Sequence, residues 1–585
     1  MRTLTLRFLA GLVLALSATG IALADNSKIS PDLQAMMANS SSNIDVIVQY
    51  NSPPQTCSSG GLLGGLLCTT VSLVGGVLKT VLGLLNAVEA TLSPEDIINT
   101  SNQSNVVYIS PNRLVAGSLD YSTAAVDAPA AWNLGLDGTG VGVAVIDSGI
   151  YPHPDLTAAG STRSRIVYRQ SFAPGVQYDD FGHGTHVAGI IAGNGKSSNL
   201  PGTPHLLRGV APNANLLDLR VLDANGTSND AAVIAAITTA IQLKNQYNVR
   251  VINLSLGRPI YESCNFDPLC KAVEAAWNAG IVVVSAAGNL GRNGYATVLS
   301  PGNDPRVITV GAMKTMETDP RSDDLIASYS SRGPTYIDQT VKPDLVAPGN
   351  MVVSLLAPGS TLSQEFPANV VSPSYYGGSA TGTPQYLRLS GTSMATPVVS
   401  GAAALLIQQN PSLTPDSIKA RLMKTAYKNF PLASTATDPT TGQSYTDNYD
   451  IFTIGAGYLD IAAALADPEV TYRSAASPSA KYNSSTQQGS LLFSGNSTWN
   501  SSPNWLSTVV WGNTVLLNGG TALWNANTAW GSNTAWGTNT AWGTNTAWGT
   551  NTAWGTNTAW GTNTAWGTNT AWGTNTAWGT SGTGE

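Results

Sequence analysis

The chain has 585 residues, a net charge of −7 and four cysteines. Its length exceeds that of one average domain, so we expect several parts. Its acidic balance argues against a nucleic-acid partner, because that would require a basic surface. The cysteines form two close pairs, Cys57 with Cys68 and Cys264 with Cys270. These pairs predict two local disulfides made in an oxidising compartment, and neither pair has the additional ligands of a zinc site.

Residues 1–24 have the pattern of a secretory signal peptide. Arg2 and Arg7 precede a short apolar run, and the small residues of Ala22-Leu-Ala24 predict cleavage after Ala24. A membrane anchor, the competing interpretation, would need a longer apolar run. We therefore expect a secreted protein, located outside the cell or in the cell envelope.

Residues 25–115 lie between the signal peptide and the part of the chain that is rich in motifs. The pattern of Ile44–Tyr50 predicts a strand, that of residues 82–91 an amphipathic helix, and that of Val106–Ile109 a second strand. These elements indicate a small domain of mixed structure.

Three short motifs place an acid, a base and a nucleophile in the order Asp, His, Ser. Asp147 follows an apolar run that predicts a buried strand of an α/β sheet, and such sheets place their sites at the carboxyl ends of strands. His183 and Ser393 each stand where a predicted buried helix begins. A serine hydroxyl needs a base within hydrogen-bond reach, and that base needs a carboxylate to orient it. The three residues therefore predict nucleophilic catalysis by serine.

A fourth motif is a β-branched strand that ends in Gly288-Asn289, whose side-chain amide suits an oxyanion donor. Taken alone, Asp147 would more often be a turn residue, and Gly391-Thr-Ser393 would suit a helix cap. Those interpretations require four independent coincidences in one order, so we prefer the catalytic one.

Together the four motifs resemble the subtilisin-like serine proteases, the subtilase family, over roughly residues 116–466. This type of triad enzyme has the order Asp, His, Ser, which separates it from two other types. The resemblance implies a three-layer α/β domain with a mainly parallel sheet. It also implies that Asp147 orients the base, His183 is the general base, Ser393 is the nucleophile and Asn289 is the oxyanion donor. The expected substrates are polypeptides, and this chemistry needs no cofactor.

The resemblance also assigns substrate-binding positions to Ser255, Leu256, Gly257, Gly226, Ala287 and Gly288. Residues 255–257 correspond to an edge segment that pairs with substrate backbone, and Gly226 lies on the opposing edge. Leu290 and Leu299 fall near the primary specificity pocket. Because neither carries a charge, we expect cleavage after uncharged, apolar residues.

Three further positions qualify this resemblance. Asp155 resembles one ligand of the family's calcium site, but residues 193–208 lack the pattern that would complete it, so a structural calcium ion stays open. His186 follows His183 without the Glu of a zinc motif, which favours a core histidine. The 43 residues between Gly349 and Ser393 predict a surface loop near the cleft.

Residues 105–113 resemble the end of the family's inhibitory propeptide. The resemblance implies that residues 25–115 form a ferredoxin-like α+β domain that inhibits the enzyme as an intramolecular partner. Removal by autocleavage is then expected between about Leu114 and Tyr121.

The composition changes again after residue 466. We interpret residues 467–498 as a linker and residues 499–585 as a tail in which tryptophan recurs at six-residue spacing, with one irregular step. In an extended chain all these tryptophans would share one face, which suits a β array or a strip that binds glycans or a cell surface. Disorder after repeat expansion is the alternative that the Gly and Asn content favours. An adhesive protein, in which the protease part serves only maturation, is therefore the alternative to a secreted, autoactivated endopeptidase.

Overall fold

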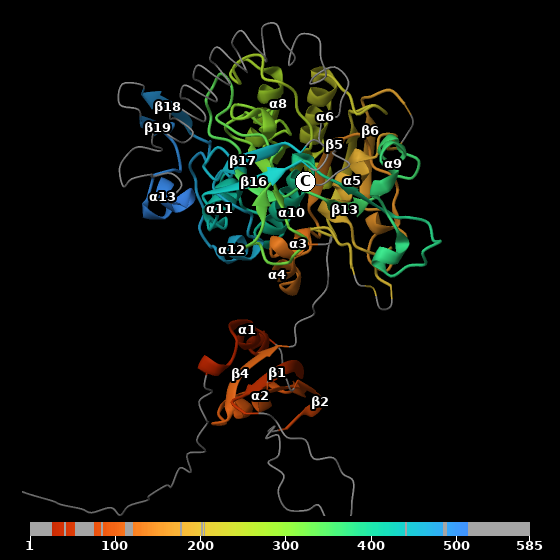
Figure 1. Cartoon of the computed structure of the whole chain (residues 1–585), viewed down its shortest axis with the longest axis vertical. Coiled ribbons are helices and arrows are strands. Elements are labelled where there is room, and N and C mark those ends of the chain that lie inside the picture. The colour runs from red at the N-terminus through yellow and green to blue at the C-terminus, as the bar shows by residue number, and fades with distance from the viewer. Residues whose placement is uncertain are drawn as a thin grey trace, which may run out of the picture. The chain divides into compact units, whose positions relative to one another are not determined.

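Figure 1 shows the computed structural model, which describes residues 26–39, 42–52, 75–82, 86–111, 121–175, 178–200, 203, 205–438, 442–483 and 488–512. The chain divides into two compact units, residues 1–115 and 116–585. The signal peptide, the pair Cys57 and Cys68, and the repeats beyond residue 512 lie outside the described residues. Within the described residues, no helix combines the length and the apolar character needed to cross a membrane.

The first unit is an α+β domain with an antiparallel sheet of order β2-β3-β1-β4. Its elements are η1 (Asn26–Lys28), α1 (Pro31–Asn39), β1 (Ile44–Tyr50), β2 (Val77–Leu82), β3 (Ala87–Leu92), α2 (Pro94–Ser101) and β4 (Val106–Pro111). Alternate side chains of β1 are buried, as expected for a strand with one face in a core. Leu33 of α1 and Ile97 of α2 belong to the same apolar core as these strands.

The helix predicted over residues 82–91 is wrong, because most of this segment is strand β3. Its side chains alternate between buried and partly buried, and it pairs with both β1 and β2. Position in a sheet outweighs the modest helix preference of Ala, Glu and Leu. A helix begins directly afterwards at Pro94, with Ser93 and Asp96 forming a capping box. The sequence carries this start signal as Ser-Pro-Glu-Asp.

The second unit is a three-layer α/β domain whose eight-stranded sheet has the order β11-β10-β9-β8-β5-β7-β6, with β12 beside β10. The strands are β5 (Gly142–Asp147), β6 (Ile166–Ser171), β7 (Asn215–Arg220), β8 (Val249–Leu254), β9 (Val282–Ala286), β10 (Ile308–Lys314), β11 (Leu325–Ile326) and β12 (Leu345–Pro348). Only the pairing of β10 with β11 is antiparallel within this described sheet. The central strands β5 and β9 are buried along their whole length, as parallel strands are when helices cover a sheet.

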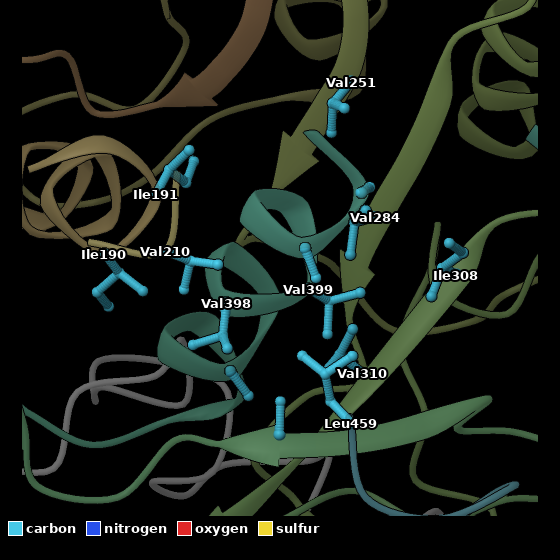
Figure 2. Close-up of a cluster of buried hydrophobic side chains, with 14 of the residues drawn as sticks. Ile190, Ile191, Val210, Val251, Val284, Ile308, Val310, Val398, Val399 and Leu459 are labelled. Carbon is cyan, nitrogen blue, oxygen red and sulfur yellow. The ribbon is translucent and has the colours of Figure 1, made fainter. Parts of the chain in front are cut away.

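Two helical pairs pack on this sheet. The helices of the second unit are α3 (Ser122–Ala125), α4 (Ala128–Asn133), α5 (His183–Ala192), α6 (Asp230–Gln242), α7 (Lys244–Tyr247), α8 (Pro268–Asn278), α9 (Thr361–Glu365), α10 (Thr392–Gln409), α11 (Pro415–Thr425), α12 (Ile461–Ala466) and α13 (Ser507–Val510). Helix α10 contacts α5 and strands β8 to β10, whereas α6 contacts α8, β5 and β8. Figure 2 shows Val398 and Val399 of α10 among apolar side chains of α5 and the sheet. Small residues permit this close packing, since a Cβ on Gly401 would lie 2.6 Å from Val210 Cβ.

The surface loop predicted between Gly349 and Ser393 is instead a small sheet of order β13-β15-β14 with short helices. Its strands are β13 (Val352–Leu355), β14 (Val370–Val371) and β15 (Tyr386–Leu389), and η5 (Pro367–Asn369) and η6 (Pro373–Tyr376) accompany α9. The rings of Tyr376 and Tyr386 are buried and meet edge to face at 4.9 Å between centroids. Burial of these aromatic rings supplies a core that the polar composition of the segment conceals.

The linker predicted over residues 467–498 is wrong, and the repeat tail does not begin at Trp499. Strands β18 (Ser479–Asn483) and β19 (Gln488–Leu492) lie in this region, and α13 contacts α11. Trp499, Trp505 and Trp511 are 2%, 5% and 1% exposed, within the core of the second unit. The rings of Trp499 and Trp511 meet edge to face at 5.1 Å. Each buried indole removes a large apolar area from water, so this segment is an integral part of the domain.

Polar contacts also join this segment to the core. The hydroxyl of Ser477 donates to Asp344, which pairs with the buried amines of Lys342 at 2.7 Å and Lys419 at 3.0 Å. Lys419 also donates to Ser477 Oγ at 2.9 Å. Ser477 therefore completes a buried charged network that begins in the catalytic-motif region of the chain.

Candidate active site

Asp147 and His183 are in direct contact at the carboxyl end of strand β5. His183, the first residue of α5, places Nδ1 2.8 Å from Asp147 Oδ1. The backbone N–H of Ser148 donates to the same carboxylate oxygen at 2.7 Å. Both side chains are buried. With Nδ1–H donating to Asp147, the lone pair of the imidazole lies on Nε2, which is the arrangement that a general base requires.

The surroundings of His183 favour its protonated form. Burial alone would lower the pKa of this imidazole, but the charge and hydrogen bond of Asp147, together with the charge of Asp179, raise the pKa above its ordinary value. The site can therefore stabilise an imidazolium.

Asp179 fastens the start of helix α5 to the end of strand β5. Its carboxylate accepts hydrogen bonds from Ser148 Oγ at 2.8 Å, Gly182 N at 2.7 Å, and Thr185 N and Oγ1 at 2.8 and 2.6 Å. Ser148 Oγ in turn accepts from Gly184 N at 2.8 Å. Burial raises the pKa of Asp179, while these four donors favour its ionised form. Asp179 was not among the residues expected from the sequence, although an acidic residue just before a helix is a recognisable signal.

Ser393, the second residue of α10, is buried beside the edge segment 255–257. Its Oγ donates to the carbonyl oxygen of Ser255 at 3.1 Å, and Ser255 Oγ donates to the carbonyl oxygen of Ser393 at 2.8 Å. Among the described residues, His183 Nε2 has no hydrogen-bond partner. The contact between acid and base is therefore formed, and the contact between base and serine is not. Such contacts often form only when substrate binds.

Asn289 lies in the same cavity as Ser393. Its Oδ1 accepts from Thr392 N at 2.9 Å and Thr392 Oγ1 at 3.0 Å. Because the carbonyl side of the amide faces Thr392, its NH₂ group is left to donate elsewhere. Leu256, Ala286, Gly288, Asn289, Leu299, Thr392 and Ser393 line this cavity. An amide donor and a serine hydroxyl thus line one small cavity.

A second cavity of about 270 Å³ adjoins the base. His183, Gly226 and residues 255–257 line it, together with the apolar side chains of Phe181, Leu222, Val233, Leu256 and Leu269. Gly226 has φ +71°, and a Cβ there would lie 2.6 Å from Phe181 Cζ. Glycine is therefore required at this edge for both backbone and space. The two predicted edges do lie on one cavity.

Two charges in the lining of this larger cavity neutralise each other. Arg258 contacts Asp230 through Nε at 2.9 Å and Nη2 at 2.9 Å, and its Nη2 also contacts Asp267 at 2.8 Å. Helix α9 supports the opposite side, because Thr361 N and Leu362 N donate to the carbonyl oxygens of Asp180 and Phe181 at 2.9 and 3.0 Å. The lining of the cavity is thus mainly apolar, and hydrogen bonds from α9 hold the segment that carries Phe181.

Ala287 does not line either of these cavities. Its N–H donates to Val310 O at 3.0 Å and its carbonyl accepts from Leu299 N at 3.0 Å, so its backbone is already used within the protein. Leu299 lines the smaller cavity, as expected for a residue near a specificity pocket, whereas Leu290 is not among its lining residues.

His186 is turned into the core. Its Nε2 lies 3.1 Å from Val352 O and 3.0 Å from Leu387 O, in the small sheet that includes β13 and β15. Burial, with the nearby charge of His183, lowers the pKa of His186 to about 3, so it is neutral. It anchors that sheet to α5.

The oxygens around Asp155 do not fit a calcium site. Asp155 Oδ1 accepts from Ser197 N and Oδ2 from Tyr386 Oη, both at 2.7 Å. The guanidinium of Arg165 takes up four backbone carbonyls nearby, those of Asp155, Thr157, Ala192 and Ala214. Calcium requires six to eight available oxygens, and here donors and an internal cation already occupy them. The sequence left Asp155 open as a calcium ligand, and in this structure both of its carboxylate oxygens accept hydrogen bonds from the protein.

One other cluster of metal-ligating residue types occurs among the described residues, namely Cys264, Cys270 and Asp304. Its two cysteines form a disulfide with 5.4 Å between Cα atoms, as the sequence predicts. The sulfurs are therefore not available as thiolates.

Comparison with known proteins identifies the family of this chain. The model of the subtilase family matches residues 138–457. Serine protease AprX of Bacillus subtilis is 41% identical over 346 residues, covering 58% of this chain and 73% of that protein. Subtilisin E of Bacillus subtilis is 35% identical over 349 residues, covering 58% and 75%. A solved cold adapted subtilisin-like serine proteinase is 31% identical and covers 50% of this chain and 85% of its own, with a TM-score of 0.37. The chain belongs to the subtilase family of serine endopeptidases.

Proposed function

We propose that this chain is a secreted endopeptidase that hydrolyses peptide bonds through an acyl-enzyme on Ser393. The single observation that carries the proposal is the 2.8 Å contact between His183 Nδ1 and Asp147 Oδ1. His183 lines one cavity, Ser393 and Asn289 line another, and Leu256 lines both. In this assignment His183 is the general base, Asp147 orients it, and Asn289 donates to the oxyanion.

The reaction begins when Ser393 Oγ leaves the carbonyl of Ser255 and donates to His183 Nε2. Oγ then attacks the scissile carbonyl while Nε2 takes its proton, and Asp147 stabilises the imidazolium. His183 returns that proton to the leaving amine as the C–N bond breaks. A water molecule next attacks the ester, with the same histidine as base, and restores Ser393.

Asn289 supports the step in which negative charge develops on the substrate oxygen. Because Thr392 holds its Oδ1, the amide is oriented before substrate arrives. A preorganised donor costs no reorganisation during the reaction. Loss of one such donor from the related enzyme subtilisin lowers kcat by about 10²–10³-fold, and we expect a loss of that order for Asn289→Ala.

We further propose that residues 25–115 act as an inhibitory propeptide removed by autocleavage. The support is the resemblance of residues 105–113 and the separate α+β core of the first unit. Secretion rests on the N-terminal sequence pattern.

The decisive experiment uses Ser393→Ala in the full chain. We expect loss of casein hydrolysis and of self-processing, because the substitution removes the attacking hydroxyl. Ser171→Ala, which changes an exposed serine, serves as the matched control. Normal processing of Ser393→Ala would refute autocatalysis, and retained casein hydrolysis would refute the assigned nucleophile.

Binding of glycans or a cell surface by the repeats is a separate proposal for residues 513–584. It rests on ten tryptophans at six-residue spacing from Trp524 to Trp578. A chain that ends at Gly512 is the proper test, because it retains the buried Trp499, Trp505 and Trp511. Loss of binding to cells or polysaccharide in this chain, with peptidase activity kept, is the expected result.

A further inference from the structure

We propose that the repeat segment 513–584 is a substrate of this chain's own active site, with its tryptophan side chains seated in the apolar cavity beside His183. This inference rests on the proposed peptidase function and names a substrate for that same site.

The cavity suits one large uncharged side chain. Its volume of about 270 Å³ is at the lower end for ligand pockets, which favours a single side chain over a larger ligand. Leu222, Val233, Leu256 and Leu269 form apolar walls. The ring of Phe181 adds an aromatic surface for edge or offset contact with an indole. Arg258 is paired with Asp230, so the lining offers little reason to select a charged group.

The segment has matching chemistry. No charged residue occurs from Tyr482 to Gly584, and tryptophan is the largest side chain of the repeated unit Thr-Ala-Trp-Gly-Thr-Asn. Substrate that pairs with the edge segment 255–257 is extended, and alternate residues of an extended chain share a face. The seven units from Trp536 to Trp572 are identical in sequence, so each presents its tryptophan in the same relation to the scissile bond. One binding register therefore serves all seven of these units.

The described part of the series shows how this chain treats such tryptophans. Trp499, Trp505 and Trp511 have the same six-residue spacing, and all three are buried against the protein's own surfaces. Trp499 also satisfies its indole N–H with Ala476 O at 2.7 Å. Burial of an aromatic side chain is strongly favourable, and the cavity beside His183 offers a further apolar place for one.

Chain length permits the contact. The described residues end at Gly512, and 73 residues follow. At about 3.3 Å per residue they can span at most about 240 Å. A compact domain of this size has a radius of gyration of only about 21 Å. The segment is also tethered, so its local concentration at the site does not fall when the protein is diluted.

The chemistry of the cut is that of the proposed function and needs only water. Ser393 Oγ bonds to the carbonyl carbon of a peptide in the repeat and its proton passes to His183. The C–N bond breaks and the proton goes to the new amino terminus. Water then hydrolyses the ester, which leaves a new carboxyl terminus on the enzyme and regenerates the serine.

The test follows purified full-length protein by intact mass spectrometry, with Ser393→Ala as the inactive control. We expect the active protein to yield truncated chains whose masses differ by whole hexapeptides, since each cut falls at one position of the repeat. The control should stay intact. A variant with serine at the ten tryptophans from Trp524 to Trp578 should be cut at least ten times more slowly, with casein hydrolysis unchanged.

Other outcomes separate this inference from the function on which it rests. Hydrolysis of casein without cleavage of the repeats would overturn the inference and leave the peptidase assignment intact. Cuts at positions without the six-residue period, or equal rates in the tryptophan-to-serine variant, would overturn the role of the cavity. Absence of casein hydrolysis would overturn both proposals.

Discussion

Ser393 and Ser255 hold each other through two reciprocal hydrogen bonds. Ser393 Oγ donates to Ser255 O at 3.1 Å, and Ser255 Oγ donates to Ser393 O at 2.8 Å. The nucleophile of the proposed triad is thereby attached to the segment expected to bind substrate backbone. Substrate that pairs with residues 255–257, as we propose, would lie next to the hydrogen bond that Ser393 Oγ must release. We therefore expect substrate binding to favour the hydrogen bond between Ser393 and His183.

Ser255→Ala should destabilise the domain. The change leaves the buried carbonyl of Ser393 without its donor and removes an acceptor from Asn253 Nδ2, which lies 3.0 Å from Ser255 Oγ. An unsatisfied buried polar group costs about 1–3 kcal/mol. Urea unfolding in a Ser393→Ala background avoids self-digestion and measures the loss, with Ser171→Ala as control. An unchanged midpoint would show that these contacts contribute nothing to stability.

The rate of peptide hydrolysis should fall at acidic pH with a midpoint above that of an ordinary histidine. His183 must be neutral to accept the serine proton, and Asp147 and Asp179 raise its pKa in spite of burial. An unperturbed histidine has a pKa of about 6.5, so we expect the midpoint of kcat/KM above pH 6.5. Asp147→Asn should lower kcat by about 10⁴-fold. A midpoint below pH 6 in the unchanged protein would contradict this account.

Asp179→Asn tests a positioning residue that does not touch the substrate. The substitution removes a negative charge near His183 and sets an NH₂ group against the N–H donors of Gly182 or Thr185. We expect kcat to fall about tenfold, KM to stay the same, and the acidic midpoint to move to lower pH.

Asp137→Asn is the matched control for that change, since Asp137 also accepts several hydrogen bonds but precedes the opposite end of β5. A purely structural role for Asp179 would lower thermal stability in both variants and leave the pH midpoint where it is.

Removal of metal should not act through Asp155. Its carboxylate oxygens accept from Ser197 N and Tyr386 Oη, and Arg165 holds the surrounding carbonyls. We expect EDTA to change the Tm of the protein and of Asp155→Asn by the same amount, measured in the Ser393→Ala background. A larger effect of EDTA on the protein with Asp155 intact would indicate a cation at this carboxylate.

The position at which the chain is truncated should decide whether the second unit folds stably. A chain that ends at Thr498 loses Trp499, Trp505 and Trp511, whereas one that ends at Gly512 keeps all three. Replacing one buried Trp by Ala typically costs about 3–5 kcal/mol, so the shorter chain should unfold at much lower urea or fail to fold. Trp511→Ala in the chain ending at Gly512 isolates one contribution. Equal stability of the two truncated chains would show that the buried indoles are not required.

Local sequence alone indicated the α/β class and brought out Asp147, His183, Ser393 and Asn289. Each stands at the end of an apolar strand or the start of a helix, and such boundaries depend on neighbouring residues. Parallel strands then bring their carboxyl ends to one edge, which explains why residues so far apart in the chain were expected to meet.

Only the tertiary structure decided what surrounds those residues. The hydrogen bond from Ser148 to Asp179 joins segments that are distant in the sequence. The burial of the tryptophans after residue 498 likewise depends on contacts with distant segments. The same reason made strand β3 resemble a helix and Asp155 resemble a calcium ligand: a strand's neighbours and a carboxylate's donors come from elsewhere in the fold. Local pattern sets where a helix or strand begins, whereas long-range packing decides which side chains are buried and what they contact.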